Sequence, residues 1–119
     1  MRHERLEVYQ RAVKLNHDVR KRLLRSQLDL ATKGQITRAF LSITANIAEG
    51  TERHTGPDCR KFYNYAKASA AECCAHLDVI RPERHVEPTV EASWRSELLA
   101  ISRILGALIH KARLPQDRR

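Results

Sequence analysis

Glycine and proline are scarce in this sequence, with four of each among 119 residues. Aromatic residues make up only 5% of the chain, and β-branched residues are also sparse. Strands favour these residue types, whereas the leucine, alanine, arginine, lysine and glutamate that dominate here are good helix formers. The composition therefore predicts an all-α protein. Because this length is typical of one domain, we expect residues 1–119 to form a single domain.

Long apolar runs are also missing, and none approaches the roughly 20 residues that a membrane span requires. The first residues contain no apolar stretch typical of a secretory signal. The three cysteines, Cys59, Cys73 and Cys74, do not suit a disulfide framework, because their number is odd and two are adjacent. Unpaired cysteines are typical of a reducing compartment. We therefore expect a cytoplasmic protein that makes no contact with a membrane.

The hydrophobic pattern predicts four helices at about 4–25, 35–49, 58–80 and 89–112, followed by a polar tail at 114–119. In each helix the apolar residues recur at spacings of three and four, which is typical of one buried face. Short connections between helices favour antiparallel neighbours. The predicted fold is therefore an up-down-up-down antiparallel four-helix bundle.

Particular residues mark the predicted ends of these helices. Gly50 follows the second apolar stripe and is predicted to be a C-cap in the left-handed conformation. Gly34 is expected in the connection before that helix or in a weakened first turn. Thr55 or Gly56 is placed to cap the third helix, with Pro57 at its first position.

The formal net charge is +8, which favours anionic partners such as nucleic acid or acidic proteins. In the predicted bundle, one end gathers the starts of the first and third helices and the ends of the second and fourth. Lys and Arg bind phosphates without regard to sequence and in a salt-dependent way, and Tyr63 and Tyr65 supply the nearby aromatic rings. The alternative is a solvated charged end that binds nothing. The candidate nucleic-acid-binding residues at this end are Arg2, Arg5, Arg53, Arg60, Lys61, Lys111 and Arg113.

Two pairs of polar residues stand beside apolar positions of neighbouring helices. Asn46 and Glu49 are three residues apart, and Ser69 and Glu72 repeat this spacing on the third helix. If the two helices are antiparallel neighbours, the four side chains can meet. We interpret them as a hydrogen-bond network that fixes the register of the helices. The alternative is a small catalytic or metal site that uses Asn46, Glu49, Glu72 and His76.

Recognisable catalytic and cofactor motifs are missing. There is no Gly-x-Ser-x-Gly, phosphate-binding loop or dinucleotide fingerprint. A metal centre in a helical bundle needs ligands from several helices, and Glu72 and His76 have no matching set elsewhere in the sequence. Cys73, Cys74 and His76 fall within one helical turn, which does not supply the separated ligand pairs of a zinc site. We therefore predict no metal, no cofactor and no enzyme activity.

The first three predicted helices resemble a known family. Residues 5–12 look like the first helix of that family, with its aromatic-Gln-x-Ala run. Residues 35–39 and 42–50, which include the string Asn-Ile-Ala-Glu-Gly, resemble its signature second helix, and residues 68–72 (Ala-Ser-Ala-Ala-Glu) with Phe62 resemble its third. This is the bacterial family of 23S ribosomal-RNA intervening-sequence proteins, to which the accessory proteins of diversity-generating retroelements are distantly similar.

The resemblance implies a four-helix bundle that assembles into a ring-like homopentamer with a non-catalytic role and an uncharacterised biological function. Spare apolar positions on the first and fourth helices independently favour self-association. We therefore expect a homo-oligomer that binds RNA or DNA through its basic end. The alternative is a structural protein–protein adaptor with a protein partner and no role with nucleic acid. The family usually has proline where this chain has Thr44 and often glycine where it has Ala68, and neither departure should change the fold.

Overall fold

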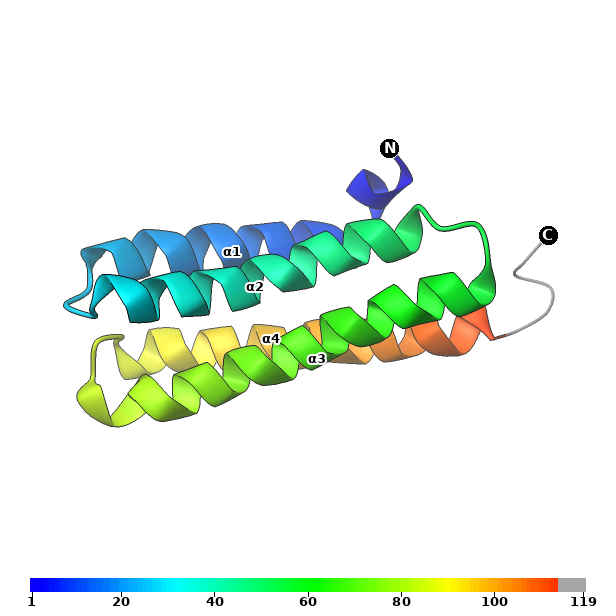
Figure 1. Ribbon diagram of the computed structural model, residues 1–119. Coiled ribbons are helices and arrows are strands. Elements are labelled where there is room, and N and C mark those ends of the chain that lie inside the picture. The colour runs from blue at the N-terminus through cyan, green and yellow to red at the C-terminus, as the bar shows by residue number, and fades with distance from the viewer. Residues whose placement is uncertain (114–119) are drawn as a thin grey trace.

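The computed structural model describes residues 1–113, and helices are the only regular elements in that range. Figure 1 shows four long helices that alternate in direction, which confirms the predicted all-α, up-down-up-down bundle. The predicted tail at 114–119 lies outside the described residues. The elements are η1 (Arg2–Arg5), α1 (Glu7–Arg25), α2 (Leu30–Thr51), α3 (Gly56–Ile80), η2 (Arg81–Glu83) and α4 (Pro88–Ala112).

Two of the predicted helix starts need correction. The expected first helix is divided, because the 3₁₀ turn η1 precedes α1. The second helix begins at Leu30 rather than near Gln35. Asp29 is its N-cap: the Asp29 carboxylate accepts a hydrogen bond from the Thr32 backbone N–H at 3.0 Å and from the Thr32 hydroxyl at 2.7 Å. This cap outweighs the unfavourable helix propensity of Gly34, which lies inside the helix.

The start of α3 agrees with the prediction. Thr55 is the N-cap, and its hydroxyl accepts a hydrogen bond from the Asp58 backbone N–H at 3.2 Å. Pro57 lies in the first turn, where its missing N–H leaves no hydrogen bond unmade. The α3 and α4 bounds lie within two residues of the predicted ones.

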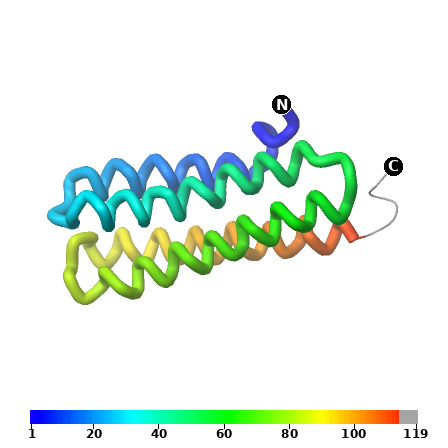
Figure 2. The backbone as a smooth tube through the Cα atoms, viewed as in Figure 1, coloured from blue at the N-terminus to red at the C-terminus, as the bar shows by residue number. Residues whose placement is uncertain are grey.

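Each of the four helices packs against two others, and Figure 2 shows the α1–α2 pair lying alongside the α3–α4 pair. The α2–α3 contact is the most extensive, and the α1–α4 contact is the least extensive of the four sides. The molecule measures 50 × 21 × 20 Å. None of the described helices is long and apolar enough to cross a membrane.

The core runs through the centre of the bundle. Trp94 of α4 and Phe40 of α2 are its largest members, with exposures of 1% and 0%, and their ring centroids lie 6.3 Å apart in an edge-to-face arrangement. Ile47 and Leu77 continue the core along α2 and α3. Full burial of each large apolar side chain contributes about 1.5–3 kcal/mol, so this core is the main source of stability.

A buried amide ties α1 to α2. The Asn16 Nδ2 donates to the Phe40 carbonyl at 2.9 Å and to the Thr44 Oγ1 at 2.8 Å, and it lies 2.9 Å from the Ala12 carbonyl of its own helix. The Thr44 hydroxyl of α2 therefore serves as an acceptor for the Asn16 amide of α1.

Gly50 does not end α2 in the way that the sequence predicts. The helix continues to Thr51, and no glycine in the described part of the chain has a positive φ. The physical role of Gly50 is a close approach to α3. A Cβ at this position would lie 2.8 Å from the Tyr63 ring and 3.2 Å from the Cys59 carbonyl oxygen. The prediction of a left-handed C-cap at Gly50 is therefore wrong, and glycine is required there because the Tyr63 ring fills the space.

Candidate functional site

The predicted basic end is present in the structure. Figure 1 shows η1, the α2–α3 connection and the end of α4 at the same end of the bundle, on the side of the N-terminus. Specific contacts hold these segments together. His3 Nδ1 lies 2.8 Å from Glu52 Oε2, and the His3 backbone N–H donates to the same oxygen at 3.0 Å. Arg60 donates to the Ala112 carbonyl at 3.2 Å, which joins α3 to the last turn of α4.

The candidate cations at this end are available to a ligand with few exceptions. Arg60 is half-buried because of its bond to α4, and the other six are exposed. Arg53 pairs with Glu49, and within residues 1–113 it is the one member of the set that has an ion-pair partner. We refer to this set as the basic end, which comprises Arg2, Arg5, Arg53, Arg60, Lys61, Lys111 and Arg113.

Several acidic residues nearby are engaged in local contacts. Glu52 accepts two hydrogen bonds from His3, and the bond from the His3 backbone N–H is the main cause that lowers the pKa of Glu52. Glu49 lies against Arg53. Asp58 is exposed in the first turn of α3, where the positive end of the helix dipole favours a carboxylate. The unpaired charge that remains at this end is therefore mostly positive.

The aromatic residues at the basic end differ from those that the sequence indicates. Tyr63 is buried, with an exposure of 6%, and its hydroxyl lies 2.9 Å from the Thr51 Oγ1, so it is unavailable to a ligand. Phe62 takes its place. The Arg53 guanidinium lies 4.6 Å from the Phe62 ring centroid, and the Lys61 Nζ lies 5.3 Å from it.

Tyr65 completes this aromatic group. Its ring packs edge-to-face against Phe62 at a centroid distance of 5.7 Å, and 49% of Tyr65 is exposed. The exposed ring stands next to the cations around Phe62, which is an arrangement that suits stacking of a base beside a bound phosphate. The spacing of three between positions 62 and 65 is the sequence signal for this pair, but the same spacing equally suits a core stripe.

The predicted polar network forms in part. The Ser42 hydroxyl links the two helices, since it lies 2.8 Å from the Ser69 Oγ and accepts a hydrogen bond from the Asn46 Nδ2 at 3.1 Å. Glu49 and Glu72 do not join it. Glu49 pairs with Arg53, and Glu72 lies 3.5 Å from the His76 Nε2. The residue that connects Asn46 to Ser69 is Ser42, which the predicted set did not include.

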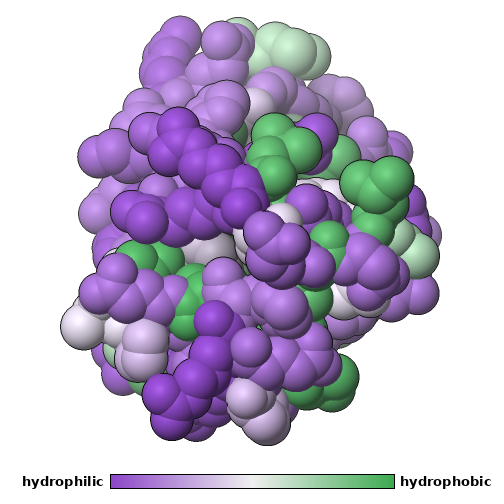
Figure 3. Space-filling view, turned by 90° about the vertical axis from the view of Figure 1, so that its left-hand side faces the viewer, coloured by the Kyte–Doolittle hydropathy of each residue, from purple (hydrophilic) through white to green (hydrophobic). Residues whose placement is uncertain are grey.

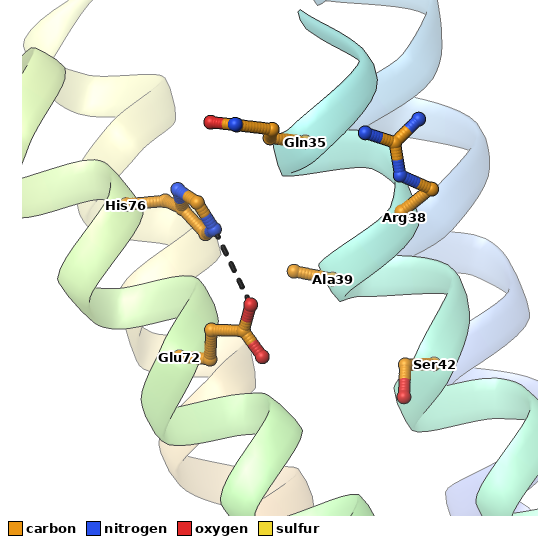
Figure 4. A pocket seen from close by; sticks show the side chains of 6 residues that line it. All are labelled: Gln35, Arg38, Ala39, Ser42, Glu72 and His76. Carbon is orange, nitrogen blue, oxygen red and sulfur yellow. Dashed lines mark ion pairs between the residues drawn. The ribbon is translucent and has the colours of Figure 1, made fainter. Parts of the chain in front are cut away.

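A polar groove of about 400 Å³ lies between α2 and α3 beside this network. Figure 4 shows Gln35 of α2 and His76 of α3 extending toward one another across it, with Glu72 paired to His76. Nucleophilic catalysis would require a hydroxyl or thiol next to a base. Here the Ser42 hydroxyl bonds to Ser69 and Asn46, while His76 pairs with Glu72. This geometry supports hydrogen bonding between helices and gives no activated nucleophile.

The cysteines and the acidic residues do not assemble into a metal site within the part of the chain that the structure describes. In that part, no three His, Cys, Asp or Glu side chains come together as a ligand set. Burial raises the pKa of the Cys73 thiol far above its usual value, and it also raises the pKa of Cys74. A buried thiol of high pKa is a poor nucleophile and a poor metal ligand, so Cys73 acts as a small core residue.

The comparisons with known proteins agree with this fold. A crystal structure of a protein of unknown function from the S23 ribosomal protein family of Bacteroides thetaiotaomicron matches with a TM-score of 0.79 and 22% sequence identity, covering 86% of this chain and 97% of that one. At this identity the likeness shows the fold alone. No curated protein matches the sequence. The family model described as 23S rRNA-intervening sequence protein matches residues 4–107. The chain therefore belongs to the 23S rRNA-intervening sequence protein family.

Proposed function

We propose that this protein is a non-catalytic homo-oligomer that binds single-stranded RNA or DNA through its basic end. The observation that carries the proposal is the juxtaposition of exposed cations with an exposed aromatic ring. Arg53 and Lys61 lie over Phe62, and Tyr65 stands half-exposed against the same ring. Phosphates would bind the cations, and a base would stack on Tyr65.

Self-association is the second part of the proposal. The outer face of α3 and α4 has a groove of about 380 Å³ in which Ala70, Ala71 and Cys74 leave space next to Leu99. Leu99 is 54% exposed, so the same face has both a protruding side chain and a depression. Exposed apolar surface of this kind is typical of a protein interface. Five copies is the number that the family resemblance implies.

Assembly would strengthen the binding of nucleic acid. A cyclic oligomer repeats the basic end of each subunit around one axis, so the modest positive field of a single copy adds to that of its neighbours. A polyanion that contacts several subunits gains affinity from each additional contact. The proposal therefore combines the basic end and self-association in one function, the binding of nucleic acid by an oligomer.

The experiment is a gel-shift assay with labelled single-stranded RNA and DNA. We expect retention at about 50 mM salt that weakens steeply by about 200 mM, because bound phosphates release condensed counterions. Lys61→Gln should reduce the affinity and the salt dependence, and Tyr65→Ala should cost about 1–3 kcal/mol through lost stacking.

The matched control is Arg103→Gln, which removes an exposed cation of α4 that has no ion pair among the described residues and lies outside the basic end. This variant should bind as the parent does. The proposal fails if neither nucleic acid is retained at low salt. It also fails if Arg103→Gln weakens binding as much as Lys61→Gln, since attraction to net charge alone would then account for retention.

A further inference from the structure

A second charged surface lies at the opposite end of the bundle, where α1 ends and α2 begins. Figure 3 looks onto this end and shows a largely hydrophilic surface that apolar atoms interrupt in several places. A groove of about 220 Å³ runs between the two helices here. The residues that line it include two cations, Arg20 and Lys33, and three leucines, Leu23, Leu24 and Leu30. The proposed function does not use this α1–α2 groove.

Two leucines at the groove are unusually exposed. Leu24 is 75% exposed and Leu30 is 83% exposed, whereas the adjacent Leu23 is buried in the core. Leu24 belongs to the last turn of α1, and Leu30 is the first residue of α2, so the connection between the helices brings both to one end. Large aliphatic side chains in water favour a partner that covers them.

The cations at the groove have no counter-charge of their own. Arg20 and Lys33, and the exposed Arg25 beside them in sequence, have no ion-pair partner within residues 1–113. Lys33 Nζ lies 3.4 Å from the Leu24 carbonyl, which holds the amine at the end of α1. The nearest acids in sequence are both engaged elsewhere: Asp29 caps α2 through Thr32, and Asp18 pairs with Arg22 and accepts a hydrogen bond from Trp94. The groove therefore combines apolar side chains with two cations, Arg20 and Lys33, that have no ion-pair partner among residues 1–113.

We propose that the α1–α2 groove binds an acidic peptide segment of a partner protein. An aliphatic side chain of the peptide occupies the groove between Leu24 and Leu30, and flanking carboxylates face Arg20 and Lys33. The same groove of a second copy does not fit as the partner, because such a two-fold contact would bring like charges together. A nucleic acid would satisfy the cations but would leave the leucines exposed, and no aromatic side chain lines the groove for stacking.

A membrane surface with anionic lipids also combines apolar and negative groups. The geometry favours the peptide, because Leu24 of α1 and Leu30 of α2 belong to a groove between two helices instead of a continuous flat face. A peptide side chain can enter such a groove, which is the way that helices and short segments dock onto helical partners. The binding is expected to be weak for one site, since exposed charge pairs contribute little.

The probe is a labelled peptide that alternates leucine with aspartate and glutamate, and binding is measured by fluorescence anisotropy at low salt. The double variant Leu24→Ser, Leu30→Ser should weaken binding about ten-fold, and Arg20→Gln about three-fold. The matched controls are Leu41→Ser on the outer face of α2, where 48% of the leucine is exposed, and Arg103→Gln on α4. Both controls should bind the peptide as the parent does.

The substituted side chains are exposed, so none of the variants should lose its fold. Circular dichroism of each variant tests this. The proposal is overturned if the peptide does not bind, or if the double leucine variant binds it unchanged. It is also overturned if a peptide with serine in place of leucine binds as tightly, because charge alone would then explain the affinity. Leucine-dependent binding to phosphatidylserine vesicles without peptide binding would assign the surface to a membrane instead.

The two proposals fail independently, since they concern opposite ends of the bundle. A single-stranded oligonucleotide bound at the basic end should not displace the peptide from the α1–α2 groove. If the oligonucleotide displaces the peptide from the parent protein but not from a Lys61→Gln variant, the peptide occupies the basic end and the assignment to the groove is wrong.

Discussion

Gly50 sets how closely α2 and α3 approach at the basic end. Its missing side chain admits the Tyr63 ring, which places the Tyr63 hydroxyl 2.9 Å from Thr51. We expect Gly50→Ala to destabilise the protein by about 2 kcal/mol, because the added methyl group would overpack against a ring and a backbone carbonyl. Urea unfolding followed by circular dichroism measures this loss.

Gly106 of α4 provides the matched control for this substitution. A Cβ there meets only the Lys67 Nζ, at an ordinary contact distance of 3.8 Å. Gly106→Ala should therefore raise stability by about 0.5–1 kcal/mol, as expected for glycine in a helix interior. If Gly50→Ala were as stable as the parent, the close packing of Tyr63 against position 50 would be incorrect.

At the scale of the helices, two polar contacts join α1 and α4 along the least extensive side of the bundle. Arg11 donates to both carboxylate oxygens of Glu97, at 2.7 and 3.0 Å. The indole N–H of the buried Trp94 donates to Asp18 at 2.7 Å. These contacts lower the pKa of Glu97, chiefly through Arg11, and the pKa of Asp18, chiefly through Trp94.

Both shifts predict that acid weakens the α1–α4 contact. Because the pKa of each carboxyl is lower in the folded state, its contribution is present above the unfolded value near pH 4 and is lost as the pH falls through the folded value. Glu97→Gln and Asp18→Asn should each cost about 1 kcal/mol at pH 7, a figure reduced for their partial exposure. The cost should shrink toward zero in acid.

Urea unfolding at several pH values measures this effect. Glu72→Gln is the control, since its partner His76 belongs to the same helix and the substitution leaves α1 and α4 untouched. It should change the stability by less than about 0.5 kcal/mol. A Glu97→Gln protein with the parent's unfolding midpoint at pH 7 would show that the Arg11 contact contributes nothing.

The helices were predictable from the sequence because their apolar periodicity is strong, but the exact face of α3 was not. Phe62, Tyr63 and Tyr65 crowd one turn, and a stripe of three-four spacing can include either Tyr63 or the pair Phe62 and Tyr65. The structure buries Tyr63 because Gly50 on α2 leaves room for its ring. Tyr63 belongs to the stripe that α3 buries, and a residue on another helix decides whether its large ring fits there. The rest of this stripe includes Cys59, Ala66, Ala70, Cys73, Leu77 and Ile80.

The candidate site was predictable to a similar extent. The up-down order of the helices brings the cations of the basic end together, because topology alone determines which helix ends are neighbours. The polar network was less predictable from the sequence. Asn46 and Ser69 are joined through Ser42, whereas Glu49 and Glu72 pair with residues four positions along their own helices. Sequence spacing identifies which side chains share a face, but competition among nearby charges decides which of them bond.

At the scale of the whole molecule, positive charge gathers at both ends of an elongated bundle. The basic end has aromatic rings among its cations, whereas the α1–α2 groove has leucines. This difference in side-chain chemistry leads us to assign a nucleic acid to one end and an acidic peptide to the other. We assign contacts between subunits to the sides of the bundle, where Leu99 is exposed on the α3–α4 face.

Assembly through that face makes a direct prediction about mass in solution. Light scattering at micromolar concentration should give the mass of an oligomer, and a pentamer is the expected form. Leu99→Glu should dissociate it, because a carboxylate placed in an apolar interface loses its hydration without gaining a partner.

Leu41→Glu is the control for this substitution. Leu41 is similarly exposed, at 48% against 54% for Leu99, but it lies on α2, away from the α3–α4 face. A monomeric parent protein would contradict the proposed assembly, and with it the argument that repeated basic ends strengthen the binding of nucleic acid. An oligomer that survives Leu99→Glu but is dissociated by Leu41→Glu would instead place the interface on α2.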